Sequence, residues 1–255
     1  MPLSHVTIDS LTIRGERALR PVPLYASLKA LLHADRFHFR VPEKASVHAH
    51  LDRVTFLNLT YWNAREASDV LVDDTIEADV LAHAAWHHAA RKALGGDPTP
   101  AALFLGESVA SSFDLFIVGH MLRQGKGNAL LDSQVPAMSA AAMDAGLTAA
   151  EVEALLADVA EDPDRAFGDL RALLFDASLA LHGCADVDSA AAALERFAAH
   201  RFIGLLHHYE LSNWVLYARA YAAAPRHDDP ALAADRALRA APSTAGWLEA
   251  HWLTG

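Results

Sequence analysis

The stretch EADVLAHAAWHHAARKAL, Glu77–Leu94, determines the expected fold class and the first candidate site. Alanine, leucine and charged residues of high helix propensity dominate it, so it predicts an α-helix. His83 and His87 are four residues apart and therefore lie on one face of that helix, about 5–6 Å apart at Cβ. This is the spacing that two imidazoles need to share a metal ion. His88 points about 100° away around the helix axis, which indicates a surface or supporting group rather than a ligand.

A second helix follows this one closely. Thr99-Pro100 predicts its start, and the sequence AALFLGESVASSFDLFIVGHML continues it to a stop around Gly125 and Gly127. Two helices joined by so short a connection should pack side by side in opposite directions. The second helix can therefore present a ligand to the histidine pair of the first.

Glu107 is that third candidate ligand. With 15 histidines in 255 residues, composition alone produces about one His-x-x-x-His pair, so a metal site requires a further group. Ser111 and Asp114 follow Glu107 at i+4 and i+7 on the same helix face, where they can orient a ligand imidazole through its other nitrogen. Three protein ligands and an open position are typical of catalytic zinc.

The rest of the chain predicts a mainly α protein (α+β) with a small N-terminal β layer. Residues 1–65 are expected to form this β-containing layer, with strands in 5–15 and 45–63 and a helix in 23–34. Residues 66–255 are expected to form the helical domain with the metal site, and the two parts should make one compact unit. Further helix starts are predicted at Thr148 with Glu151, Asp162-Pro163, Asp188-Ser189 and Asp229-Pro230, and Asp74 with Glu77 predicts a cap for the first helix. The longest helix is expected from Ser189 to Ala223, and residues 123–146 are expected to form a loop between helices.

Composition excludes several classes of protein. The net charge of −11 and the scattered arginines argue against nucleic-acid binding, which requires clustered positive charge. The single cysteine, Cys184, permits no internal disulfide and no thiolate zinc site, so we expect a cytoplasmic protein whose metal is held by histidine and carboxylate. No stretch predicts a signal peptide or a membrane span.

The segments HAAWH (His83–His87) and GESVASSFDLFIVG (Gly106–Gly119) resemble the gluzincin metallopeptidases of the thermolysin type, in order and in spacing. That family carries H-E-x-x-H on one helix and a Glu on the next helix, in a context like N-E-A-x-S-D. The resemblance covers only His83 to Gly119. It implies zinc bound by His83, His87 and Glu107, a peptide or protein substrate, and an active-site half formed by two helices.

Ala84 is the main departure from the family pattern. The general base of the family is the Glu that follows the first histidine, and alanine can neither accept nor donate a proton. The chain as written is therefore expected to be an inactive or weak peptidase. Three explanations of Ala84 stay open. The chain is a natural inactive relative of the family, it is a variant inactivated by substitution, or its metal site serves other chemistry. Two histidines and one carboxylate also form the facial triad of non-haem iron oxygenases, which requires no base at Ala84.

A second polar group lies in HRFIGLLHHYELSNW, residues 200–214. His200, His207 and Glu210 share one face of the expected long helix, and Gly204 lets a neighbour approach them. By analogy of role with the gluzincins, His207 or Tyr209 would bind a developing oxyanion. Two alternatives stay open: a non-catalytic helical binding protein, and a di-iron bundle that lacks the usual Glu-x-x-His spacing and uses the residues Glu77, Asp79, Glu107, Asp114, His207 and Glu210.

Overall fold

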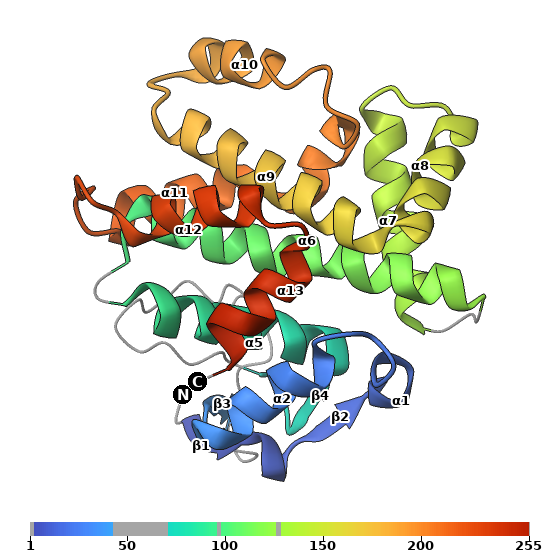
Figure 1. Ribbon diagram of the computed structural model, residues 1–255, viewed down its shortest axis with the longest axis vertical. Coiled ribbons are helices and arrows are strands. Elements are labelled where there is room, and N and C mark those ends of the chain that lie inside the picture. The colour runs from blue at the N-terminus through green and yellow to red at the C-terminus, as the bar shows by residue number, and fades with distance from the viewer. Residues whose placement is uncertain (1–2, 43–70, 96–97, 126–128, 255) are drawn as a thin grey trace.

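The computed structural model describes residues 3–42, 71–95, 98–125 and 129–254. Of these residues, 72% are helical and 7% lie in strands, which confirms a mainly α protein with a small N-terminal β portion. The helices lie in layers around one long central helix, and the N-terminal elements cover one side of the stack (Figure 1).

The N-terminal layer contains two small sheets. In the first, β1 (Leu3–Thr7) pairs antiparallel with β3 (His38–Pro42); in the second, β2 (Thr12–Arg14) pairs parallel with β4 (Thr75–Glu77). The short helices η1 (Ile8–Ser10) and α1 (Glu16–Leu19) precede α2 (Tyr25–Ala34), so the strands and the helix expected in 5–34 are present. The strand expected in 45–63 lies outside the described residues.

The centre of the molecule is the helix pair α5 (Ala78–Leu94) and α6 (Pro100–Gln124). In Figure 1 α5 lies on one side of α6, and α9 (Pro163–His182) lies on the other. Trp86 of α5, Phe113 and Phe116 of α6 and Phe167 of α9 join the three helices through ring contacts of 5.2–5.8 Å. This aromatic cluster forms the centre of the hydrophobic core.

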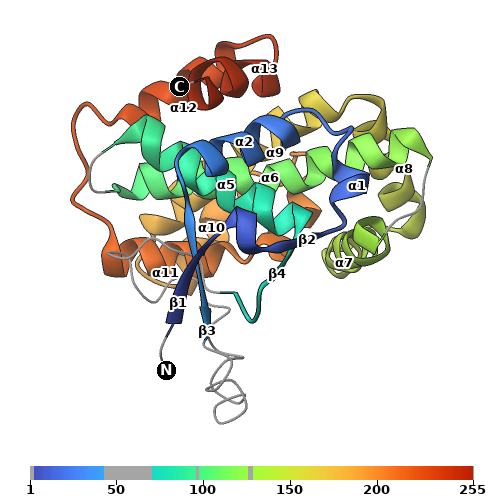
Figure 2. The ribbon, with the colours of Figure 1, turned by 90° about the horizontal axis from the view of Figure 1, so that it is seen from below.

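By length and composition α6 is apolar enough to cross a membrane. However, 78% of its apolar window is buried inside the protein. A helix that is apolar on all sides is expected at the centre of a larger helical protein, where neighbours cover it all round. Figure 2 shows this central position from a second direction.

The remaining elements follow α6 in chain order. They are α7 (Ala129–Asp144), α8 (Ala149–Glu161), α9, α10 (Val187–Glu195), the 3-10 helix η3 (Ile203–Tyr209), α11 (Leu211–Tyr221), α12 (Pro230–Ala240), α13 (Thr244–Leu248) and the π-helix η4 (Glu249–Leu253). Trp252 of η4 contacts Trp86, with 6.5 Å between ring centroids, so the C-terminal turn packs against α5.

Most of the predicted helix caps are confirmed. Thr99 accepts a hydrogen bond from the backbone of Ala102, Thr148 and Glu151 form a complete capping box, and Asp162 and Asp229 cap α9 and α12. Two predictions were wrong. Thr75–Glu77 is a strand, so Asp74 does not cap α5, and the cap of α10 is Asp186, with Ser189 at its third helical position.

The predicted loop over 123–146 is mostly the helix α7, which contains Pro136 in its interior. The predicted helix from Ser189 to Ala223 is interrupted. The chain turns after α10, forms η3, and passes through Glu210, whose φ of +48° lies in the left-handed region and ends η3 before α11 begins. The longest described helix is therefore α6, with 25 residues.

Candidate metal site

The candidate site lies along the seam between α5 and α6. Small residues on both helices let α5 and α6 approach closely, and on α5 the buried Ala90 lies opposite Gly106 of α6. Gly106 contributes from the other side: a Cβ at this position would lie 3.4 Å from Ala90 Cβ and 3.9 Å from His87 Nδ1. The residue after it, Glu107, is thereby brought next to the histidine pair.

His83, His87 and Glu107 form one group, as the sequence predicts. Each offers one ligand atom, and these atoms all lie within 4.8 Å of one another. His87 Nε2 is 3.5 Å from Glu107 Oε2, and the two imidazole rings are 4.9 Å apart at their centroids. Ligand atoms 2.0–2.2 Å from zinc lie about 3.4 Å apart in a tetrahedral site. The donor types fit a divalent metal ion, and small side-chain rotations would close the longest separation.

The group is accessible from solvent. About 32% of each histidine side chain and 14% of the Glu107 side chain are exposed. A site with this exposure has room for a water molecule or a substrate beside three protein ligands.

Asp114 lies next to His83, seven residues after Glu107 and therefore about two turns further along α6. Its Oδ2 is 3.6 Å from His83 Nδ1, which is an electrostatic contact and too long for a hydrogen bond. The contact occupies the Nδ1 side of the imidazole and leaves Nε2 for a metal. Ser111 is also on α6, between Glu107 and Asp114, and is buried.

Burial controls the charge of Glu107. It raises the pKa of the Glu107 carboxyl to about 7, and the opposing effect of His83 is smaller. The carboxyl is therefore partly protonated near neutral pH. A cation beside it would favour the carboxylate, since an adjacent positive charge stabilises the ionised form.

Ala84, the position of the missing general base, lies in the hydrophobic core and is 5% exposed. It follows His83 by about 100° around the helix, which turns it away from the accessible side of the seam. A carboxylate placed there would enter an apolar environment, at considerable cost in free energy unless it found a partner.

The polar face predicted for His200, His207 and Glu210 does not exist as a helix face, because the chain turns between η3 and α11. His207 is exposed, and Glu210 accepts a hydrogen bond from Asn213. Gly204 does allow a close approach, since a Cβ there would lie 2.9 Å from Leu147 Cδ1 and 3.6 Å from Ala142 Cα. The close neighbour is the end of α7.

Tyr209 lies in the core near Asp114. Its hydroxyl is buried and has no hydrogen-bond partner in the described part of the chain, and burial together with the Asp114 charge raises its pKa. The adjacent His208 is also near Asp114; burial lowers the pKa of its imidazole, and the charges of Asp114 and Glu210 oppose that shift. The sequence did not single out His208, because its position depends on the turn at η3.

The α5 face continues beyond the histidines at the same four-residue spacing. Asp79 precedes His83 by one turn, and burial and the Asp114 charge raise the pKa of its carboxyl. Arg91 follows His87 by one turn and acts on Tyr217, whose pKa is raised by burial and by Glu107. An i, i+4 pattern over residues 79–91 was available in the sequence and could have identified both ends.

His88 is separate from the group, as expected. Its Nε2 lies 2.8 Å from Asp35 Oδ2, and Lys92 binds the same carboxylate. In the described residues, no second group of three His, Cys, Asp or Glu brings its ligand atoms as close as the group of His83, His87 and Glu107. Glu77 pairs instead with Arg14, at 2.7 Å. The six residues of the di-iron alternative therefore do not converge on one site.

No family model matches this chain, and neither the curated proteins nor the solved structures include a match. The resemblance to the gluzincins thus rests on the sequence motif between His83 and Gly119 alone.

Proposed function

We propose that this protein is a metal-dependent hydrolase of the zinc metallopeptidase type, acting on peptide bonds. The observation that carries the proposal is the convergence of His83, His87 and Glu107 from two antiparallel helices, with all ligand atoms within 4.8 Å. The donor set, the partial exposure of the ligands and the order of the motif all support zinc.

Each residue has a role in this proposal. His83, His87 and Glu107 hold the metal, and Asp114 orients His83 through its Nδ1 side. Bound zinc would polarise a substrate carbonyl and lower the pKa of a bound water. Tyr209 has no catalytic part in this proposal, because its hydroxyl is buried and has no hydrogen-bond partner among the described residues.

Ala84 leaves the site without the usual general base, so weak hydrolysis or none is expected of this chain. The substrate would be a peptide or protein, and the single cysteine favours a cytoplasmic setting. The negative net charge gives no support to nucleic acid as a partner.

Metal content tests the proposal most directly. Protein purified without chelator or nickel resin should contain close to one zinc per chain by mass spectrometry, and His87→Ala and Glu107→Gln should lose most of it. His88→Ala is the matched control, because it removes the neighbouring imidazole, which pairs with Asp35 outside the metal group. Equal metal content in all four proteins, or none in any, would refute the site.

An iron-dependent oxygenase is the second candidate, and the burial of Ala84 favours it. The facial triad uses the same three ligands and requires no base in the core position of Ala84. Iron in place of zinc, with oxygen consumption on addition of ferrous iron that is lost in His87→Ala, would support this reading.

The variant Ala84→Glu separates the two enzymes. In the hydrolase, metal-dependent cleavage of a broad peptide set should appear in the variant, provided that its melting temperature shows a folded protein. A folded, metal-loaded variant without cleavage would contradict the peptidase proposal. Absence of metal from the wild-type protein would instead leave a helical binding protein.

A further inference from the structure

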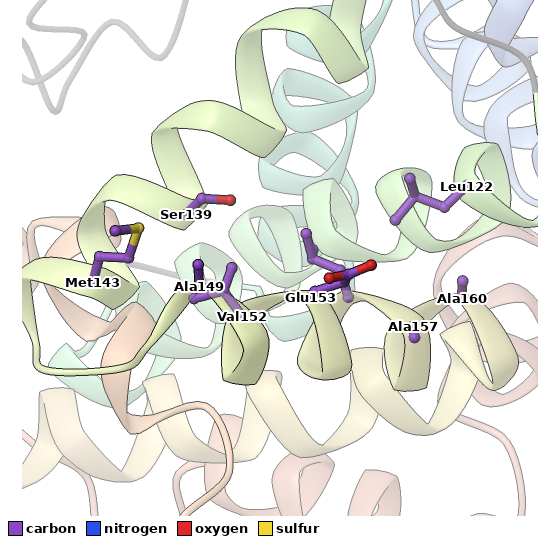
Figure 3. Close-up of a pocket in the computed structure, with 9 residues that line it drawn as sticks. Leu122, Ser139, Met143, Ala149, Val152, Glu153, Ala157 and Ala160 are labelled. Atoms are coloured by element: carbon purple, nitrogen blue, oxygen red, sulfur yellow. The ribbon is translucent and has the colours of Figure 1, made fainter.

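An open apolar groove lies outside the candidate metal site and shares no residue with it. It has a volume of about 430 Å³ and runs between α7 and α8, with the end of α6 at one side (Figure 3). We call it the α7–α8 groove; its lining residues are Leu122, Ser139, Met143, Ala149, Val152, Glu153, Leu156, Ala157 and Ala160.

The shape of the groove suits a helix. Its α8 side consists of residues spaced three or four apart from Ala149 to Ala160, which is about 16 Å along the helix axis. Ala149, Ala157 and Ala160 have short side chains, so the backbone of another helix could approach to the usual 8–10 Å. Three helices already border the groove, and a fourth would complete a packing arrangement like that of the rest of the protein.

The α7 side of the groove can adapt to partners of different shape. Met143 of α7 is half exposed, and methionine fits partners of different shape because its side chain is unbranched and polarisable. Ser139 of α7 and Glu153 of α8 point into the groove in Figure 3 and are the polar groups in its lining. The interior is therefore apolar with one carboxylate at its edge.

The charge around the groove is strongly one-sided. Residues 129–164, which form α7, α8 and the start of α9, contain no Lys, Arg or His. They contain eight acidic residues, in a chain whose net charge is −11: Asp132, Asp144, Glu151, Glu153, Asp158, Glu161, Asp162 and Asp164.

Cations from other segments neutralise only part of this charge. Arg165 and Arg201 both bind Asp158, and Arg123 donates to the backbone carbonyls at the end of α8. Glu153, Asp132 and Asp144 have no such ion pair in the described residues. The groove thus combines an apolar floor with an acidic border.

We propose that the α7–α8 groove binds an amphipathic helix with basic flanks, supplied by a partner protein. The apolar face of this helix would lie on Leu156, Val152 and Met143, and its Lys or Arg residues would meet Glu153 and the acidic border. Helix-in-groove binding of this kind takes its energy from the apolar face and its selectivity and association rate from charge.

Two other occupants fit the charge less well. A second copy of this chain would place acidic α7–α8 surfaces against each other, which costs free energy through like-charge repulsion. An anionic membrane surface would repel the same border.

A labelled model helix tests the proposal. The probe is a synthetic peptide of leucine and lysine, about 14 residues or about 21 Å long as a helix, with all leucines on one face. Its fluorescence anisotropy is titrated with the full-length protein, beside a scrambled peptide of equal charge and a peptide with glutamate in place of lysine. Analytical ultracentrifugation of the protein alone reports self-association.

Ala157→Gln is the informative variant, because it fills the groove at an exposed helix position that tolerates a long side chain. Ala154→Gln is its matched control on α8, exposed and outside the lining. We expect saturable binding of the leucine–lysine helix that weakens at least about tenfold in Ala157→Gln and in the scrambled peptide, with Ala154→Gln close to wild type.

Several results would overturn the proposal. Equal binding of the ordered and scrambled peptides would mean general charge attraction, and equal loss in both variants would place the peptide elsewhere. No binding at low salt would mean that the α7–α8 groove does not bind a basic amphipathic helix. A dimer that Ala157→Gln dissociates would make a second copy the occupant.

Discussion

At the scale of single residues, Arg171 shows how strongly the core depends on charge pairing. Its side chain is 1% exposed, and its Nη1 lies 2.6 Å from Asp235 Oδ1, so α9 and α12 are joined by a buried ion pair. Burial lowers the pKa of Arg171, and Asp235 opposes that shift through its hydrogen bond and its charge. Asp235 also accepts hydrogen bonds from Arg239.

Removal of one partner of this ion pair should therefore lower the stability of the protein strongly. We expect Asp235→Ala to lower the free energy of unfolding by about 3–5 kcal/mol, because the guanidinium would stay buried without its counter-charge. The double variant Arg171→Met, Asp235→Leu should be closer to wild type in urea denaturation. A loss below about 1 kcal/mol in Asp235→Ala would show that water or a nearby carboxylate such as Asp176 compensates the Arg171 charge.

Among single residues, those of the candidate metal site are predicted well by the sequence. The spacing of His83 and His87 is local to one helix, and Glu107 is brought opposite them by a short connection. The neighbours of Asp114 were not predictable in this way. Tyr209 and His208 reach it from a segment about 95 residues further along the chain, after a turn that no local pattern indicates.

At the scale of elements, Gly119 determines how closely α6 meets the end of α8 and the start of α9. A Cβ at this position would lie 2.7 Å from the Val159 carbonyl oxygen and 3.1 Å from Pro163. In an open helix, Gly→Ala stabilises by up to about 1 kcal/mol. Here we expect Gly119→Ala to destabilise by about 1–3 kcal/mol, since the obstacle is backbone.

Thermal and urea unfolding of Gly119→Ala measure this effect, and Gly183→Ala provides the comparison. The nearest atom to a Cβ at Gly183 is the Ala180 carbonyl oxygen at 3.5 Å, an ordinary contact. Equal stability of the two variants would mean that α6 can move slightly away from α8 and α9 without a loss in the free energy of unfolding.

The first residues of α6 and α12 are connected through their caps. Thr99 accepts from the Ala102 amide and donates to Asp229 Oδ2 at 2.6 Å, while Asp229 Oδ1 accepts from the Ala231 amide. We expect Asp229→Ala to cost about 1–2 kcal/mol for its own cap, and more because the Thr99 hydroxyl loses its acceptor.

A double-mutant cycle with Thr99→Val isolates the connection between these caps. Coupling of about 0.5–3 kcal/mol in urea denaturation is expected for residues in one hydrogen-bond network. Strictly additive losses would show that the two caps act independently.

Sequence reasoning succeeds for elements where the signal is local. The cap pairs Thr99-Pro100, Thr148 with Glu151, Asp162-Pro163 and Asp229-Pro230 each mark a helix start correctly. It fails where tertiary packing overrides the local pattern. The alanine-rich segment after Ser189 is divided between α10, η3 and α11, and residues 129–144 form a helix despite Pro136.

At the scale of the whole molecule, partly buried histidines make stability depend on pH. Burial lowers the pKa of His120, His182 and His200, and Arg123 and Arg219 add to this effect at the first two. The Nδ1 of His200 also accepts a hydrogen bond from the Phe202 amide, which requires the neutral ring. The folded protein therefore favours the uncharged form of these side chains.

The direction of this pH dependence follows from the number of protons that the folded and unfolded chains bind. An unfolded histidine titrates near pH 6.5, so below that pH the unfolded chain takes up more protons than the folded one and the free energy of unfolding falls. We expect stability to decrease between pH 7 and pH 5, and the variant His120→Gln, His182→Gln, His200→Gln to lose less over this range. Glu107 and Asp79 act in the opposite direction, since their pKa values are raised, but they are common to both proteins. Parallel pH curves from urea denaturation would contradict the prediction.

The burial of α6 also has a consequence for synthesis on the ribosome. Its apolar surface is covered largely by α9, which ends at His182, 58 residues after α6 ends at Gln124. At 5–20 residues per second, translation of that interval takes about 3–12 s, during which a long apolar helix has emerged without its later partner. The α5–α6 hairpin can form meanwhile, because its contacts are local in sequence. The nascent chain is therefore most exposed to aggregation in this interval, and a chaperone that binds apolar helices would act there.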